Sequence, residues 1–195
     1  MSKAAETRQM ILQRSFELIY QKGYQATSID NILATTQVTK GAFFYHFKNK
    51  DEMGLALINE VLYPGMYATM VKPLLDSHDP VNEIYAMMRN LLIKIPFLRA
   101  KYGCPAINLI EEMSPLNESF RKALVRLTNE WQDAIADNIE QGKVKGDIRS
   151  NVNSKHTACF IVAGYSGIRN MGKAMGSGCY TVYLQELKNY LQQLK

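Results

Sequence analysis

The side chains that most often do chemistry are few in this chain and widely spaced. No spacing typical of a metal site occurs among its cysteines and histidines, which are Cys104, Cys159, Cys179, His46, His78 and His156. Only His156 and Cys159 could share a helical face, and two ligands at one spacing predict surface or core positions rather than a metal centre. We therefore expect neither a metal nor a cofactor.

Catalytic motifs are also missing. The sequence has no glycine-rich phosphate loop, no Gly-x-Ser-x-Gly, no His-Glu-x-x-His and no Cys-x-x-Cys. Glu111 and Glu112 are paired carboxylates, but adjacent residues of a helix point in different directions and do not converge on one substrate atom. An enzyme is therefore disfavoured. It remains an alternative, as does an all-helical protein-interaction module.

The positive charge of the chain is concentrated at its start. Residues 1–50 hold seven basic and three acidic side chains, a net charge of +4, whereas residues 51–195 hold sixteen and fifteen, a net charge of +1. A concentrated positive field favours a polyanion, because cationic side chains release counterions from phosphates. A solvated basic face without a partner would carry the same charge, so the order of the motifs must decide.

Three helical patterns occupy this basic segment. Apolar periodicity predicts a first helix from Ala4 to about Gln21, which Gly23 ends. Thr27, with Asp30 three residues later, predicts the capped start of a second helix. Thr39 predicts the cap of a third helix over residues 40–47, and Asn49 predicts the cap of a fourth helix that starts at Lys50. Two short helices joined by about four residues form a helix-turn-helix pattern.

The third helix has residues suited to contact with base edges. Val38, Phe43 and Phe47 are expected to pack inward. The positions left to face outward are Thr39, Lys40, Ala42, Tyr45 and His46. Small residues near the start of such a helix let it approach bases closely in a major groove. The capped helices and the basic charge together predict that this segment binds DNA.

Residues 23–32 and 38–50 strongly resemble the signature of TetR-family regulators. They read Gly-Tyr-Gln-Ala-Thr-Ser-Ile-Asp-Asn-Ile and Val-Thr-Lys-Gly-Ala-Phe-Phe-Tyr-His-Phe-Lys-Asn-Lys. The resemblance implies that Thr27 and Ser28 start the second helix and contact phosphates. It implies a recognition helix whose base-directed residues are Thr39, Lys40, Gly41 and Ala42. The residues implied to clasp the DNA backbone are Tyr45, His46 and Lys50.

Two positions depart from the family pattern. Gln37 stands in the turn where the family usually has glycine, so a left-handed backbone there would be strained by about 1 kcal/mol. Phe44 stands where the family usually has a tyrosine that contacts phosphate, and its ring has no hydroxyl to donate. The neighbouring Tyr45 could take over that contact, and we keep Phe44 among the expected DNA-facing positions.

The rest of the chain predicts a larger helical domain over residues 50–195, following a DNA-binding domain over residues 1–49. The fourth helix is expected to be disturbed at Pro64-Gly65. Pro73 and residues 77–80 are expected to mark a break, after which Asp79 caps the next helix and Pro80 starts it. A long helix is expected to end at Gly142. We thus expect an all-α protein with an N-terminal three-helix helix-turn-helix domain and a helical ligand-binding and dimerisation domain.

The last two predicted helices, about 153–173 and 179–194, are apolar on more than one side. The first carries Phe160, Ile161 and Met171, and the second carries Leu184 and Tyr190. A helix that is apolar on two faces must bury both, so a second subunit is one partner and an internal core is the alternative. The family resemblance implies the same homodimer, whose paired recognition helices would read a near-palindromic operator.

The middle helices hold candidates for an effector site. Aromatic walls with a few polar groups suit a small molecule, although plain core packing is the alternative for each residue. The candidates are Phe97, Tyr102, Cys104, Asn108, Trp131, Tyr165 and Arg169. Cys104 carries a second hypothesis, because an exposed cysteine near a helix N-terminus could sense electrophiles or oxidants.

These features together predict a DNA-binding transcriptional regulator, a repressor released from its operator by a small-molecule effector. The sequence holds no apolar run near the roughly 18 residues that a membrane span requires, and no signal-peptide pattern at its start. We therefore expect a cytoplasmic protein without a membrane partner.

Overall fold

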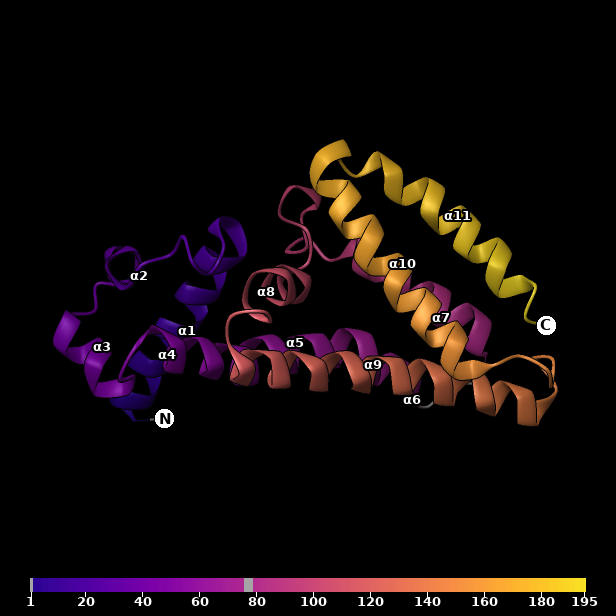
Figure 1. Ribbon diagram of the computed structural model, residues 1–195, viewed down its shortest axis with the longest axis horizontal. Coiled ribbons are helices and arrows are strands. Elements are labelled where there is room, and N and C mark those ends of the chain that lie inside the picture. Colours follow the sequence, from indigo (N-terminus) through magenta and orange to yellow (C-terminus); the bar gives the residue numbers. More distant parts are fainter. Residues whose placement is uncertain (1, 76–78) are drawn as a thin grey trace. The chain divides into compact units, whose positions relative to one another are not determined.

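The computed structural model describes residues 2–75 and 79–195, and helices are the regular elements of this described part (Figure 1). The all-α prediction is confirmed. The chain forms two compact units, one from the residues up to Gly65 with Pro105–Val125, the other from Met66–Cys104 with Arg126–Lys195. This division does not coincide with residue 50, and the functional boundary there stays a prediction. None of the described helices is long and apolar enough to cross a membrane.

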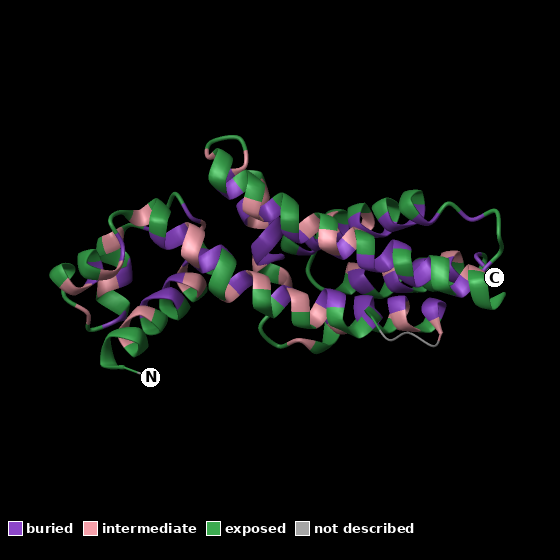
Figure 2. Cartoon of the chain, turned by 90° about the horizontal axis from the view of Figure 1, so that it is seen from below, coloured by how far each residue is buried: buried purple, intermediate pink, exposed green. Residues whose placement is uncertain are grey.

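The first unit is built around the predicted helix-turn-helix. Its helices are α1 (Lys3–Lys22), α2 (Ile29–Thr35), α3 (Lys40–His46), α4 (Lys50–Leu57), α8 (Pro105–Met113) and the first turns of α9 (Glu118–Lys145). Ile11, Ile32, Phe43, Phe47 and Met53 lie at its centre and are almost fully buried. Figure 2 shows the buried residues as stripes along the helices, as amphipathic helices require.

The caps of these helices are mostly the predicted ones. Thr39 caps α3 by accepting from the Ala42 amide, and Asn49 caps α4 by accepting from the Glu52 amide. For α2 the prediction was wrong by one residue. Ser28, not Thr27, caps the helix, and its reciprocal partner is Asn31 rather than Asp30.

Prolines in the middle of the chain are accommodated without ending the helical path. After α4 come a π-helical turn η1 (Ile58–Leu62), α5 (Tyr63–Met66), a second π-helical turn η2 (Tyr67–Val71) and α6 (Lys72–Leu75). Pro64 and Pro73 are each the second residue after a π-helical turn, so the disturbance expected at Pro64 is present as a π-bulge, whereas the helix does not end at Pro73 but continues to Leu75. A proline clashes with the carbonyl one turn earlier, and a π-bulge shifts that carbonyl away.

The second unit contains the other helices. They are η2, α6, α7 (Pro80–Arg89), a π-helical turn η3 (Asn90–Lys94), a 3-10 turn η4 (Ala100–Tyr102), the rest of α9, α10 (Ser154–Met175) and α11 (Gly178–Gln192). The last two lie side by side as a hairpin, and α11 also packs on α7 (Figure 1). Asp79 caps α7 and Pro80 starts it, as predicted, whereas residues 77 and 78 of the expected break, with His78, lie outside the described residues.

The long helix α9 does not end at Gly142. It continues to Lys145, and Gly146, with φ +83°, follows its last residue. Gly142 lies buried inside the helix, where an added Cβ would come 2.9 Å from side-chain atoms of both Ile148 and Pro80. Its role is therefore close packing, and the predicted helix end was wrong.

Candidate functional site

The start of α3 is open to solvent. Thr39, Lys40 and Gly41 are exposed, and a Cβ added to Gly41 would meet no atom within 4 Å. On the opposite side of the helix Phe43 is fully buried, and Phe47, just after the helix, is also buried. Val38, also predicted to pack inward, is only half-buried. The helix thus presents small and basic residues outward from a rigid apolar base.

The turn before α3 has the left-handed backbone that glycine would favour. Gln37 has φ +38°, the one positive φ found for a non-glycine residue in the described part of the chain. We expected strain at Gln37 if its backbone were left-handed, and this expectation is confirmed. The cost of such a conformation is of the order of 1 kcal/mol.

The outer aromatic residues of α3 are well exposed. Tyr45 is 78% exposed and Phe44 is 44% exposed, although the Phe44 ring still contacts Phe43 edge-on at 5.5 Å between centroids. His46 is half-buried beside Tyr45, with ring centroids 4.9 Å apart. Lys40 lies 3.8 Å from Asp30, a solvent-exposed ion pair of small energy that leaves the ammonium group available to another anion.

The two residues at the start of α2 have different environments. Ser28 is exposed, as a phosphate contact requires. Thr27 is fully buried, and its hydroxyl donates to the Gly23 carbonyl over 2.7 Å. The Thr27 hydroxyl therefore closes the turn after α1. A contact between Thr27 and a DNA phosphate stays a prediction.

Lys50 is engaged inside the first unit. Its Nζ donates to the carbonyls of Tyr24, over 3.1 Å, and Thr27, over 3.0 Å. The same ammonium group lies 4.4 Å from the centre of the Tyr24 ring. These contacts fix the segment that precedes α2. A contact between Lys50 and a DNA phosphate stays a prediction and would have to use the remaining N–H.

A carboxylate that the sequence reasoning set aside holds the same segment from the other side. Glu112 of α8 accepts from the backbone N–H of Tyr24, over 2.8 Å, and of Gln25, over 2.6 Å. Gly23 has φ +92°, and a Cβ there would lie 3.2 Å from the Glu112 carboxylate. No local sequence signal could have revealed this contact, because its partners are 88 and 87 residues apart.

Tyr24 links this segment to α4 and α9. Its hydroxyl donates to Asp51 over 2.6 Å, and its ring packs edge-on against Phe120 at 5.1 Å between centroids. Burial, followed by the hydrogen bond to Asp51, raises the pKa of Tyr24 well above its usual range. The phenol therefore stays a neutral donor at every physiological pH.

The structure brings only some of the expected effector residues into contact with one another. Trp131 and Tyr165 pack edge-to-face at 5.2 Å between centroids, and the indole N–H points at the Met87 sulfur over 3.3 Å. Cys104 and Arg169 are buried in the same unit, whereas Phe97 is 40% exposed and Tyr102 is half-buried. Asn108 belongs to the first unit, on α8.

The sensor hypothesis for Cys104 required an exposed thiol. Cys104 directly precedes α8, as expected, but it is only 1% exposed. A buried thiol behaves as a small apolar side chain, so the structure does not support an exposed electrophile sensor at this position.

The α10–α11 hairpin has an apolar outer side. Ile161, Leu184 and Leu187 are buried within the unit. Large apolar side chains that remain exposed on the hairpin are Phe160, Met171, Met175 and Val182. The two-sided apolar pattern predicted for these helices is thus present, with one side left uncovered in a single chain.

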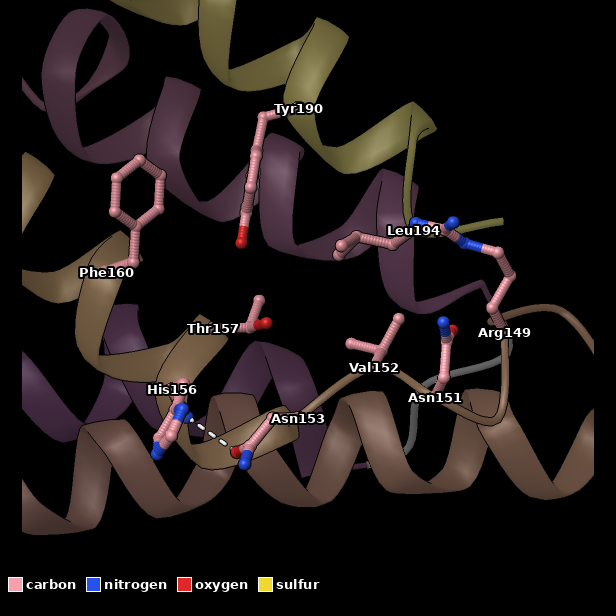
Figure 3. A pocket seen from close by; sticks show the side chains of 9 residues that line it. All are labelled: Arg149, Asn151, Val152, Asn153, His156, Thr157, Phe160, Tyr190 and Leu194. Atoms are coloured by element: carbon pink, nitrogen blue, oxygen red, sulfur yellow. Dashed lines mark hydrogen bonds between the residues drawn. The ribbon is translucent and has the colours of Figure 1, made fainter.

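A surface pocket of about 450 Å³ lies at the end of this hairpin (Figure 3). Phe160 and Tyr190, whose ring centroids are 4.8 Å apart, form its aromatic wall. Its other lining residues are Arg149, Asn151, Val152, Asn153, His156, Thr157 and Leu194. None of the expected effector residues lines it, and within the described residues no cluster of His, Cys, Asp and Glu could hold a metal ion.

A capped, exposed helix after a tight turn, on an all-helical chain, defines the class of helix-turn-helix DNA-binding regulators. Residues 11–57 match the family described as bacterial regulatory proteins, tetR family, and residues 80–183 match the tetracyclin repressor-like C-terminal domain. The chain therefore belongs to the TetR family, as the sequence resemblance predicted. It is a DNA-binding transcriptional regulator with a C-terminal ligand-binding domain.

Individual relatives agree with this assignment. An uncharacterized HTH-type transcriptional regulator in the lacX 3' region of Lactococcus lactis subsp. lactis is 38% identical over 140 residues, which is 68% of each chain. The HTH-type transcriptional repressor DhaR of Mycobacterium sp. (strain GP1) is 26% identical over 160 residues, 82% of this chain and 79% of that one.

Solved structures share the fold. The TetR-family transcriptional regulator from Cytophaga hutchinsonii superposes with a TM-score of 0.85 at 20% identity, covering 100% of this chain and 98% of the other. The reduced form of NemR from Escherichia coli gives 0.82 at 20% identity, covering 96% of each chain.

Proposed function

We propose that the chain is a repressor that acts as a homodimer and leaves a near-palindromic operator when a small molecule binds its second unit. The outward face of α3 carries this proposal. Its start, with exposed Thr39, Lys40 and Gly41, is where a recognition helix meets base edges. Ser28, Phe44, Tyr45 and His46 flank that start and are assigned to the DNA backbone.

Binding to the promoter upstream of the chain's own gene tests the DNA part of the proposal. Fluorescence anisotropy should show salt-dependent binding, tighter than to scrambled DNA of equal length. Lys40→Ala should lower the ratio of specific to nonspecific affinity about tenfold or more. Lys94→Ala, at an exposed lysine of the second unit, is the matched control. Equal binding to both DNAs by the unmodified protein would reject a sequence-specific regulator.

The exposed apolar side of the α10–α11 hairpin supports the dimer. Phe160 is 58%, Met175 is 67% and Val182 is 68% exposed. Several large apolar side chains left exposed on neighbouring helices are typical of an interaction surface. A two-fold axis would bring the same face of a second copy against it and form a four-helix interface. Such symmetry also matches the spacing of two half-sites on DNA.

The oligomeric state tests this assignment. Phe160→Glu should shift the protein from dimer to monomer in sedimentation equilibrium, because a carboxylate would be buried without a partner. As a control, Val144→Glu places a carboxylate at an exposed apolar residue of α9 and should leave the dimer intact. A Phe160→Glu dimer as stable as the unmodified one would place the interface elsewhere.

A further inference from the structure

The second unit contains a buried cation without a buried anion. Arg169 of α10 is 0% exposed. One Nη donates to the Leu98 carbonyl over 3.2 Å and the other donates to the Gly103 carbonyl, but its Nε has no hydrogen-bond partner in the described part of the chain. Nor does any described Asp or Glu form an ion pair with it.

This arrangement leaves a charge unbalanced. Arginine stays protonated at all relevant pH values, so burial cannot neutralise it. The two carbonyl dipoles compensate part of the cost, whereas a full negative charge at the free N–H would compensate much more. An anion held at this position would therefore balance a charge that the fold leaves uncompensated.

Two phenols near the guanidinium carry O–H groups of their own. Tyr165 lies one turn before Arg169 on α10, and Tyr180 comes from the first turn of α11, its ring centre 5.6 Å from the Arg169 Cζ. Both are 1% exposed, and neither hydroxyl makes a hydrogen bond of good geometry among the described residues; the Tyr165 hydroxyl lies near the Cys104 thiol, and the Tyr180 hydroxyl lies near the Arg169 guanidinium. Burial, as the largest cause, raises the pKa of Tyr165 well above 10, so its hydroxyl stays protonated.

The donor set selects among anions. One free N–H and two O–H groups match the two oxygens of a carboxylate, whose single charge balances one guanidinium. A phosphate dianion would have more acceptors than these donors and would leave a net buried negative charge. Trp131, packed on Tyr165, offers an apolar wall to the organic part of a ligand.

We propose that the effector is a small organic carboxylate, held by the Arg169 Nε–H and by the hydroxyls of Tyr165 and Tyr180. This inference rests on the proposed function, in which the second unit binds the effector. It assigns the chemical class of that effector and the residues that recognise it.

Thermal unfolding of the full chain provides the test. The probes are sodium salts of straight-chain carboxylates from acetate to octanoate and of benzoate, at about 10 mM, enough to populate a site of millimolar Kd. The matching primary amides and sodium chloride serve as ligand controls. We expect at least one carboxylate to raise Tm by several degrees while its amide and chloride do not. Stabilisation by none of the carboxylates, or equally by the amides, overturns the proposal.

Variants separate recognition from folding. Arg169→Gln should abolish the Tm shift, whereas Arg149→Gln, which removes an exposed guanidinium that also donates to a carbonyl, should keep it. Arg169 also donates to the carbonyls of Leu98 and Gly103, so its replacement could disturb the fold. Tyr165→Phe and Tyr180→Phe therefore provide a second test. Removing an unpartnered hydroxyl should leave the fold unharmed and weaken carboxylate binding about tenfold. Unchanged binding in both variants overturns the assigned site.

Operator binding by the ligand-free protein is measured separately. If it is absent, the proposed function fails, and the carboxylate site is still judged by Tm alone. If it is present, the stabilising carboxylate should lower operator affinity at least tenfold. A carboxylate that binds at Arg169 without changing operator affinity overturns its assignment as the effector.

Discussion

Single residues of the DNA-facing surface differ in what they contribute. Phe44 is 44% exposed beside the more exposed Tyr45, so part of its ring is open to solvent. In contrast, the Thr27 hydroxyl and the Lys50 ammonium group donate hydrogen bonds to backbone carbonyls of the segment after α1. The family resemblance alone did not distinguish these two kinds of residue.

Adding the missing hydroxyl at Phe44 should strengthen DNA binding. Phe44→Tyr is expected to raise affinity about threefold to tenfold on specific and scrambled DNA alike, because a phosphate contact carries no sequence information. Anisotropy titrations at fixed salt measure this change. Tyr45→Phe, which removes a hydroxyl from the neighbouring residue, should weaken both affinities. If Phe44→Tyr strengthened binding to the specific operator only, that result would contradict a phosphate contact.

Removing the Lys50 ammonium group should destabilise the first unit. Lys50→Ala loses two charge-assisted hydrogen bonds to partly buried carbonyls, and we expect the free energy of unfolding to fall by about 1–3 kcal/mol. Urea unfolding followed by circular dichroism measures it. Lys48→Ala, at an exposed neighbouring lysine, should change stability by less than about 0.5 kcal/mol. Equal effects of the two variants would indicate that the contacts of Lys50 add nothing.

At the scale of elements, two helical glycines differ in the space around them. Gly41 in α3 has open space around its Cα, whereas Gly142 in α9 is enclosed by Ile148 and Pro80. Both are helical positions where alanine has the higher intrinsic propensity. The space around each glycine, and not its helix propensity, therefore decides whether alanine raises or lowers the free energy of unfolding.

Alanine at these two positions should therefore act in opposite directions. Gly41→Ala is expected to raise the free energy of unfolding by about 0.5 kcal/mol and to weaken operator binding, because a methyl group obstructs close approach to the bases. Gly142→Ala should lower the free energy of unfolding by about 1–3 kcal/mol through overpacking and leave operator contacts unaltered. Urea unfolding and anisotropy on both variants check the pair. Tighter operator binding by Gly41→Ala would contradict the assignment of α3.

At the scale of the whole molecule, one ion pair joins two segments of the first unit that lie far apart in the sequence. Arg8 of α1 pairs with Glu60 of η1, 52 residues away, and its guanidinium lies 5.0 Å from the Phe47 ring centre. The hydrogen bond from Arg8 lowers the pKa of Glu60 below its usual 4.5. Both side chains are partly exposed, so we expect at most about 1 kcal/mol from the pair.

The depressed pKa of Glu60 sets the pH range in which this pair stabilises the fold. Its contribution is fully present above the unfolded pKa of 4.5 and is lost as pH falls through the lower folded value. Glu60→Gln should therefore be less stable than the unmodified protein at pH 7, with a gap that closes on acidification. Urea unfolding between pH 7 and about pH 3 measures that gap. A gap that persists at the acidic end would assign the loss to packing.

Much of the fold follows from local sequence. Thr39, Asn49 and Asp79 cap their helices through contacts three residues away, and apolar spacing defines each helix one turn at a time. Such signals act within a few residues, so the order of helices and the helix-turn-helix were predictable. Even the left-handed backbone at Gln37 was indicated by the turn residue that the family prefers there.

Tertiary structure decided what those local signals left open. Glu112 joins backbone amides 88 and 87 residues away, Cys104 is buried, and Pro64 and Pro73 stay within helical segments. The unbalanced Arg169 is also visible only once the neighbours of α10 are known. Burial and hydrogen-bond satisfaction depend on which distant segments pack together, and no window of a few residues contains that information. The sequence alone determined a helical DNA-binding regulator, and the packing determined which of its polar groups remain free to bind.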